Sequence, residues 1–299
     1  MEAWQAVERA LHNPMRKSMN EEPFFVRDGQ RELFAILHRP SGAADIGCAI
    51  VFCSAFAGEH NMSRRVLVTF ARLLASQGFH VLRFDYSGSG DSGGDFRNTT
   101  IETYVADTRL AIQALRQRAP CSRVGLLGLR LGSLVGAMTC AADDIDFLVL
   151  WAPVVDVRRL FDGLLRSCLA TQMAYEHLVA RNRAELKQRL LAGEEVNMGG
   201  YLLTGEMIRW ADSFEIERIA KANHPPCLVV DMSKTEKAAL SADARLWRTS
   251  LQHNEACQAV AITEDSFWQD LPIYRQNSNP AFQQTLQWLR ATKGLRLNT

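Results

Sequence analysis

The stretch from 124 to 137 constrains the fold more than any other part of the 299-residue chain. An apolar run beginning at Val124 leads into Gly128-Leu-Arg-Leu-Gly132, and small residues continue from Ser133 as in a closely packed helix. Glycines two positions before and after a central residue indicate a tight strand-to-helix turn whose backbone passes close to its neighbours. The central residue is Arg130, which stays protonated and offers only donors. A cation is therefore expected on a sharp turn at the end of a buried strand.

Strands and helices alternate on both sides of this turn. Apolar runs typical of buried strands occupy 46–53, 79–85, 147–153, 225–231 and 256–262. Helical periodicity occupies 66–77, 100–118, 240–251 and 279–291. The pair Asp28-Gly29 between two apolar runs predicts an antiparallel hairpin at the start. We therefore predict an α/β fold with a mostly parallel central sheet, an antiparallel start and helices on both faces.

The same pattern predicts how the chain is divided. Residues 1–22 are a polar lead-in with no assigned role, and residues 54–65 are expected to form a loop. The sheet and its helices are predicted from 23–153 and 224–299. Between them, 154–223 carries several helical segments broken near Gly193 and Gly199-Gly200, and is predicted to be a helical cap inserted over the strand ends.

Composition narrows the possible partners and compartment. The net charge is +1 and no basic stripe is interleaved with aromatics, so no nucleic-acid surface is expected. The seven cysteines are scattered and form no C-x-x-C pair, which indicates free thiols in a reducing compartment. We see neither a secretory leader nor a run long enough to cross a membrane. A cytoplasmic location is expected, and no metal or cofactor is predicted.

The order of elements over roughly 23–292 resembles the α/β-hydrolase fold. The turn from Asp85 to Ser92 is similar to the D-x-x-G-x-G-x-S turn of the serine-aminopeptidase and lysophospholipase-like branch. Residues 56–65, the motif from Gly128 to Gly132 and the pair Phe267-Trp268 resemble the bacterial exosortase-associated hydrolases, whose elbow also reads G-L-R-L-G. The resemblance implies a hydrolase frame with nucleophile, acid and histidine in that order along the chain.

All three of those positions are altered. Arg130 stands where the nucleophile belongs, and an arginine cannot attack an acyl carbon. In the loop expected to hold the acid, Asp231 comes too early and Glu236 one place late, and Thr235 is nearest. No histidine follows the last strand at 264–268, and His253 precedes that strand. We therefore predict a degenerate triad and a pseudoenzyme.

Arg130 has two interpretations. It begins a helix whose free N–H groups already favour an anion, so it predicts a pocket for an acidic ligand. The residues expected to line that pocket are Arg130, Glu59, Leu131, Phe56, Asp231 and Trp268. Alternatively its charge is neutralised internally, by Glu59 first, or by Asp231 or Asp265, because a buried unpaired arginine is costly.

The sequence offers three candidate catalytic residues, and none is assigned as catalytic. The candidates are His60, Cys53 and Ser133. A surface or loop-ordering role is favoured for His60, a core thiol for Cys53, and for Ser133 a first-turn residue that satisfies a backbone N–H. Further predictions are that Asp156 is a cap hinge or helix N-cap, that Asp85 holds its glycine turn, and that Phe267 and Trp268 close the pocket or belong to the core.

Two classes of function follow. The first is a non-catalytic or divergent hydrolase-fold protein that binds an anionic or acylated small ligand, a protein partner or a second copy of itself. The second is an active hydrolase or acyltransferase of esterase or thioesterase type, acting on acyl or polysaccharide precursors of a bacterial export system through an unorthodox residue.

Overall fold

The computed structural model describes residues 20–140, 143–175, 182–216, 219, 224–235, 239–251, 257–269 and 279–292. Most of the lead-in predicted at 1–22 therefore lies outside the described residues, as do Glu236 and His253. The first strand begins within the range assigned to that lead-in, at Glu21.

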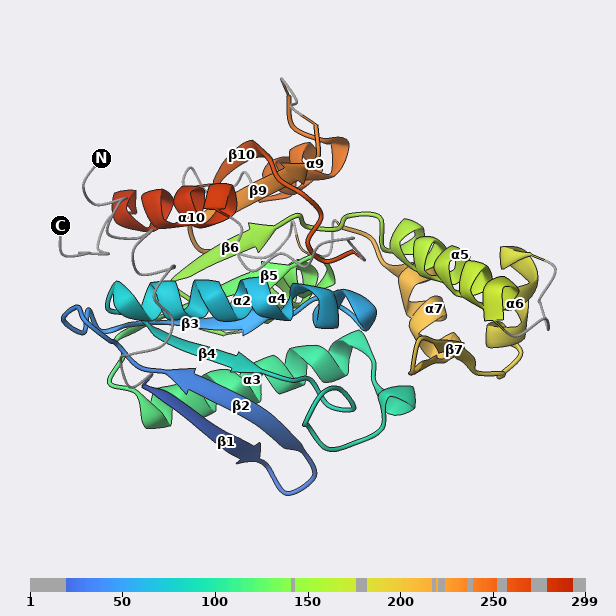
Figure 1. The fold of residues 1–299 in the computed structure, drawn as a ribbon, viewed down its shortest axis with the longest axis horizontal. Coiled ribbons are helices and arrows are strands. Elements are labelled where there is room, and N and C mark those ends of the chain that lie inside the picture. Colours follow the sequence, from blue (N-terminus) through green and yellow to red (C-terminus); the bar gives the residue numbers. More distant parts are fainter. Residues whose placement is uncertain are drawn as a thin grey trace.

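The core is one eight-stranded sheet in the order β1-β2-β4-β3-β5-β6-β9-β10 (Figure 1). Only the β1/β2 and β2/β4 pairs are antiparallel, and the remaining neighbours run parallel. The predicted fold class, with its antiparallel start, is confirmed. The strands are β1 (Glu21–Arg27), β2 (Glu32–His38), β3 (Cys48–Cys53), β4 (His80–Phe84), β5 (Arg123–Leu129), β6 (Phe147–Trp151), β9 (Cys227–Ser233) and β10 (Cys257–Thr263).

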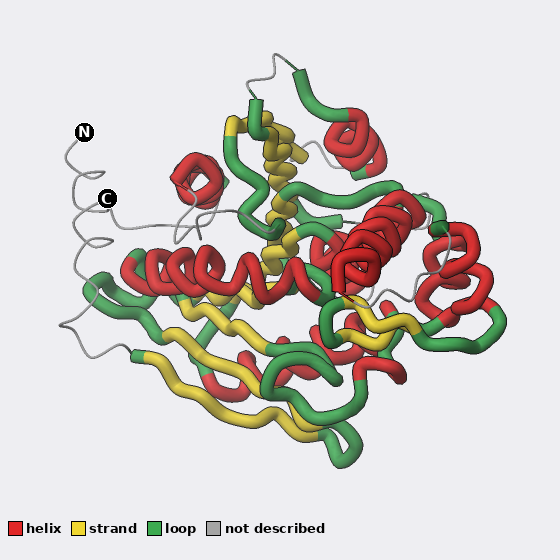
Figure 2. The backbone as a smooth tube through the Cα atoms, turned by 45° about the vertical axis from the view of Figure 1, so that its right-hand side comes forward, coloured by secondary structure: helices red, strands yellow, loops and turns green. Residues whose placement is uncertain are grey.

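Helices cover both faces of the sheet because each presents an apolar stripe to it. One face is covered by α2 (Gly58–Ser76) and α10 (Asn279–Ala291), which meet where the rings of Phe70 and Phe282 stack at 4.6 Å. The other face is covered by α3 (Ile101–Arg118), α4 (Leu131–Cys140) and α9 (Ala242–Ser250). Figure 2 shows the strands lying between these helical layers.

The loop predicted at 54–65 is wrong over most of its length. Helix α2 already begins at Gly58, eight residues before the helix expected from the apolar pattern at 66–77. Its first turns bury polar side chains, His60 and Ser63, instead of apolar ones. A search for apolar periodicity therefore misses this start, which brings Glu59 and His60 onto a rigid element.

The segment between β6 and β9 is not purely helical. It contains α5 (Val157–Tyr175), α6 (Arg183–Leu191), α7 (Gly205–Ser213) and an antiparallel pair of short strands, β7 (Val196–Met198) and β8 (Tyr201–Leu203). Gly199 and Gly200, expected to break a helix, both have positive φ and make the turn of this hairpin. Asp156 accepts a hydrogen bond from the N–H of Arg159 at 2.9 Å, as predicted for an N-cap of α5.

These inserted elements lie beyond the carboxyl ends of the parallel strands (Figure 1). Tyr201 of the hairpin packs edge-on against Phe96 at 4.9 Å, in the short 3₁₀ helix η1 (Phe96–Asn98) before α3. The indole N–H of Trp210 donates to Glu102 Oε1 at 2.9 Å, at the start of α3. The insertion is thus attached to the sheet domain by specific side chains. Its separate role as a cap remains a proposal.

The cysteines and the helices can be compared with what composition predicts. All seven cysteines are free thiols, and all but Cys121 and Cys257 are buried. Among the described helices, none is both long enough and apolar enough to pass through a bilayer.

One buried hydrogen bond links the sheet to α10 and gives a test of the core. The indole N–H of Trp151 donates to Thr285 Oγ1 at 2.9 Å, and both residues are fully buried. Thr285→Val keeps the shape but leaves this N–H without an acceptor, so we expect a loss of about 1–3 kcal/mol in unfolding free energy by urea denaturation. The same substitution at exposed Thr249 in α9 is the control, with an expected change within about 0.5 kcal/mol. Equal effects at the two positions would contradict this interpretation.

Candidate functional site

The turn between β5 and α4 has the geometry that its glycines predict. Arg130 is left-handed, with φ of 56°, and its N–H donates to the Trp151 carbonyl at 3.0 Å. A Cβ on Gly132 would lie 2.1 Å from the carbonyl oxygen of Cys53, and one on Gly128 would lie 2.4 Å from Ser133 Cα. Neither position has room for a side chain, because the obstructing atoms belong to the backbone. The side chain of Arg130 is therefore held at the carboxyl edge of the sheet.

The guanidinium of Arg130 is paired with Glu59, the partner considered first from the sequence. Its Nε donates to Glu59 Oε1 at 3.2 Å, and its Nη1 to the Ala152 carbonyl at 3.4 Å. The guanidinium carbon lies 5.3 Å from the centre of the Trp268 ring, a cation–π distance. Within the described part of the chain, Nη2 has no hydrogen-bond partner. Glu59, the Ala152 carbonyl and the Trp268 ring therefore fix the Arg130 side chain, and Nη2 is the donor group that has no partner among the described residues.

Glu59 is the more buried member of the pair. Its side chain is 12% exposed, against 21% for Arg130. Burial raises the pKa of its carboxyl, and the charge of Arg130 and its hydrogen bond offset this only in part. Its second oxygen, Oε2, is buried and has no hydrogen-bond partner among the described residues. The carboxylate therefore has one satisfied oxygen and one unsatisfied oxygen.

Backbone strain is concentrated around this pair. The described non-glycine residues with positive φ are Ala57, Arg130 and Ala152. Ala57 precedes the helix that carries Glu59, and Ala152 supplies the carbonyl that Arg130 contacts. Such conformations cost about 1–3 kcal/mol each and persist where the surrounding structure fixes them, often at functional sites. The strain at Ala57 and Ala152 has no signal in the sequence.

Two backbone N–H groups near the pair have no hydrogen-bond acceptor among the described residues. In the described part of the chain, the N–H groups of Phe56 and Leu131 donate to no protein acceptor. Leu131 is the first residue of α4, where a helix leaves its N–H groups unsatisfied, and Phe56 follows β3 shortly before α2. An N–H from each of these two positions forms the oxyanion hole in hydrolases of this architecture. Both residues were predicted to contact a ligand, and this remains a prediction.

The remaining predicted ligand contacts separate into two groups. Trp268 packs on Arg130 and is 5% exposed, and Phe267 beside it is 2% exposed, so both belong to the core. Asp231 does not pair with Arg130, because Ser241 donates to both of its oxygens, from its N–H at 2.6 Å and from its hydroxyl at 3.0 Å. Ser241 is the N-cap of α9, so Asp231 anchors the start of that helix.

Two catalytic candidates are engaged in the core. Burial raises the pKa of the Cys53 thiol to about 12, which leaves it protonated at neutral pH. The Ser133 hydroxyl donates to the Gly128 carbonyl at 2.9 Å. The sequence instead predicts that it satisfies a backbone N–H. Ser133 lies in the first turn of α4, and its hydroxyl faces back to the end of β5.

His60 belongs to a second polar cluster that the sequence did not reveal. Its Nε2 lies 3.3 Å from Asp85 Oδ1 and 3.2 Å from Arg64 Nη2. It is buried in the first turn of α2, so the expected loop-ordering role is replaced by a role in this cluster. Burial opposes ionisation of Asp85, but hydrogen bonds from His60 and the Asp91 N–H, together with the charges of His60 and Arg64, lower its pKa. The Asp91 contact also holds the glycine turn, as predicted for Asp85.

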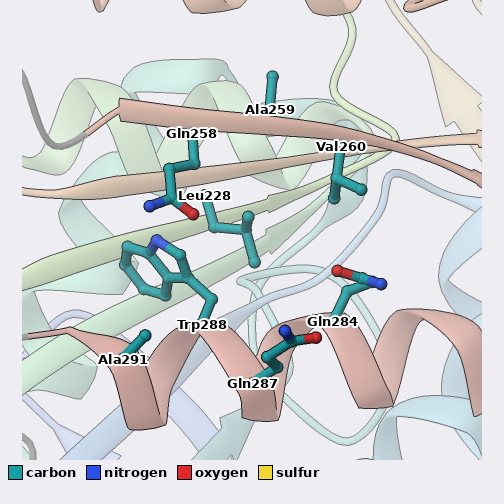
Figure 3. Close-up of a pocket in the computed structure, with 8 residues that line it drawn as sticks. All are labelled: Leu228, Gln258, Ala259, Val260, Gln284, Gln287, Trp288 and Ala291. Carbon is teal, nitrogen blue, oxygen red and sulfur yellow. The ribbon is translucent and has the colours of Figure 1, made fainter.

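A separate hollow lies at the β10 edge of the sheet. It has a volume of about 150 Å³ and opens between β10 and α10, where Gln258, Gln284, Gln287 and Trp288 line it (Figure 3). None of its lining residues carries a charge or belongs to the predicted site. Over the described residues, no group of acidic, cysteine and histidine side chains is arranged to hold a metal ion.

Comparison with known proteins identifies the architecture. The family model for serine aminopeptidase, S33, matches residues 49–207. A search of curated proteins gives no match. Among solved structures, Est1E from Butyrivibrio proteoclasticus, with ferulic acid bound, is 16% identical, with 89% of this chain and 99% of that chain covered and a TM-score of 0.60.

Two further solved structures agree with this fold. The esterase Pf2001 from Pyrococcus furiosus is 15% identical, with 93% and 92% of the two chains covered and a TM-score of 0.59. The protein XC6422 from Xanthomonas campestris, described as a serine hydrolase without lid, is 15% identical, with 93% and 97% covered and a TM-score of 0.58. At such low identity these likenesses establish the fold alone.

The close packing of the turn gives a stability prediction with a control in the same helix. Gly132→Ala would place a Cβ against two backbone carbonyls, so we expect a loss of about 2–4 kcal/mol in unfolding free energy. A Cβ on Gly136, one turn later, would meet nothing nearer than 3.5 Å. Gly136→Ala should be neutral or stabilising by up to about 1 kcal/mol. Thermal and urea unfolding of both variants check this, and a tolerated Gly132→Ala would show that the turn is looser than described.

Proposed function

Since the chain belongs to the serine aminopeptidase (S33) family, a branch of the α/β-hydrolases, we propose that it is a divergent member that binds an acylated or anionic small ligand without cleaving it. The ion pair between Arg130 and Glu59 carries this proposal. It stands on the turn where the family's nucleophile would be, and it presents a guanidinium that has no nucleophilic lone pair.

The absence of an alternative nucleophile in the same place supports the proposal. Cys53 is held protonated by burial, and the Ser133 hydroxyl is committed to the Gly128 carbonyl. An activated nucleophile needs a base within hydrogen-bond reach, and no histidine occurs in 264–269 after the last strand. Among the described residues of this region, the nucleophile and the histidine base that the family's triad requires are therefore missing.

Binding capacity is retained where catalysis is not. The free N–H groups of Phe56 and Leu131 and the free Nη2 of Arg130 are donors suited to a carbonyl or carboxylate oxygen. The Trp268 ring and the aromatic cluster around Phe56 make the surroundings of these donors apolar, with Phe161 edge-on to Phe56 at 5.4 Å. These features suit an acid whose carbon chain or ring is apolar. A protein partner, a homodimer and a cytoplasmic location remain predictions alongside it.

A catalytic alternative rests on one observation. His60 and Asp85 form a buried pair, and such a pair is two thirds of a hydrolase triad. Against it, the Nε2 that approaches Asp85 is also contacted by Arg64, and none of the nucleophile candidates contacts His60. An esterase or acyltransferase of the exosortase-associated type would have to work through this histidine. Loss of measurable wild-type activity in His60→Ala would support that alternative.

The substitution Arg130→Ser tests the proposal directly. We expect no hydrolysis of p-nitrophenyl acetate or butyrate above the buffer rate by the wild type or the variant, because a restored serine still lacks a base. We expect benzoate, used as a probe carboxylate, to bind the wild type and to bind Arg130→Ser about 10- to 100-fold more weakly, as the loss of a charged hydrogen bond implies. Calorimetric titration and an ester assay measure both. Ester hydrolysis gained by Arg130→Ser would contradict the proposal.

A further inference from the structure

The charges around Arg130 determine what form of ligand can enter. Arg130 and Glu59 already neutralise each other, and both side chains are largely buried. A carboxylate added to this pair would leave one uncompensated negative charge in a poorly solvated place, which is unfavourable. One proton taken up with the carboxylate removes that excess charge.

The unsatisfied atoms of the pair match a carboxyl group that carries one proton. Arg130 Nη2 is a donor without a partner in the described part of the chain, and Glu59 Oε2 is a buried acceptor that also lacks one there. A carboxylate oxygen of a ligand can accept from Nη2. Its other oxygen faces Glu59 favourably only if a hydrogen lies between them, since two carboxylate oxygens repel each other.

We propose that this site takes up a monocarboxylic acid together with one proton, which is shared between the ligand carboxyl and Glu59 Oε2 while Arg130 donates to the other ligand oxygen. This inference rests on the proposed function and specifies the ligand form that the site selects. No covalent bond is made or broken, and the proton comes from the solvent. A primary amide, which carries its own donor beside its carbonyl oxygen, satisfies the same two atoms without a proton.

The neighbouring charged groups are consistent with Glu59 as the residue that shares the proton. On α2, His60 and Arg64 face Asp85, which lies just after β4. Arg130, at the β5–α4 junction, is the charged group that acts on Glu59, and burial raises the pKa of the Glu59 carboxyl. The segment after β10 contributes Trp268, an uncharged neighbour, and also carries Asp265.

The test is calorimetric titration of the full chain with benzoate and with benzamide, in buffers of different ionisation enthalpy, from pH 6 to 9. For wild type and benzoate we expect uptake of about one proton at the alkaline end, where affinity falls by about tenfold per pH unit. The sign follows from the proton being a reactant, so that raising the pH opposes binding. Benzamide should bind with no proton uptake and no pH dependence.

Glu59→Gln separates this inference from the proposed function. Its amide can donate to the ligand and still accept from Arg130, so benzoate should bind without proton uptake and with constant affinity over the same pH range. Glu206→Gln, an exposed glutamate of α7, is the matched control and should retain the wild-type proton uptake.

Each outcome has one meaning. Benzoate binding to the wild type without proton uptake at any pH, or with the same uptake in Glu59→Gln, would overturn the proton-sharing inference and leave the binding function intact. Failure of both probes to bind the wild type and Glu59→Gln would overturn the proposed function itself.

Discussion

The burial of Glu59 beside Arg130 is the interaction on which the site depends. A carboxylate in this position is favoured only because a guanidinium lies 3.2 Å away, and removing either partner leaves the other charge poorly solvated. The pair joins α2 to the turn after β5, two elements that in this architecture flank the reaction centre. Electrostatic compensation is thus part of the carboxyl edge of the sheet, where α2 meets this turn.

The turn holds its shape with an arginine at its centre, and packing explains why. Gly128 and Gly132 are required by the backbone atoms that approach them, from Ser133 on one side and Cys53 on the other. Those contacts are set by the crossing of strand and helix and do not depend on which side chain stands at position 130. The packing of the turn therefore leaves the side chain at position 130 open, provided that the residue tolerates a left-handed backbone, as Arg130 does.

The sequence predicts the order of sheet and helices because each buried strand is an unbroken apolar run, such as Cys48–Cys53. It also predicts the partnership of Glu59 with Arg130, because a buried arginine needs a carboxylate. It misses the start of α2, whose buried residues there are polar, and the hairpin at Gly199-Gly200, where two glycines also resemble a helix break. The contact of His60 with Asp85 joins residues 25 positions apart in sequence through the sheet, so no local pattern signals it.

Glu59 and His60 are consecutive residues that enter two different polar networks. The carboxyl groups of these networks, Glu59 and Asp85, have pKa values shifted in opposite directions. Asp85 receives hydrogen bonds from His60 and from the N–H of Asp91, with Arg64 nearby, so its ionised form is favoured despite burial. Glu59 has one cation, one hydrogen bond and an unsatisfied oxygen, and burial raises the pKa of its carboxyl. Where neighbouring environments shift two acids in opposite directions, their roles also differ. Asp85 is a fixed charge that supports the turn and α2, and Glu59 is the acid that we propose shares a proton with a ligand.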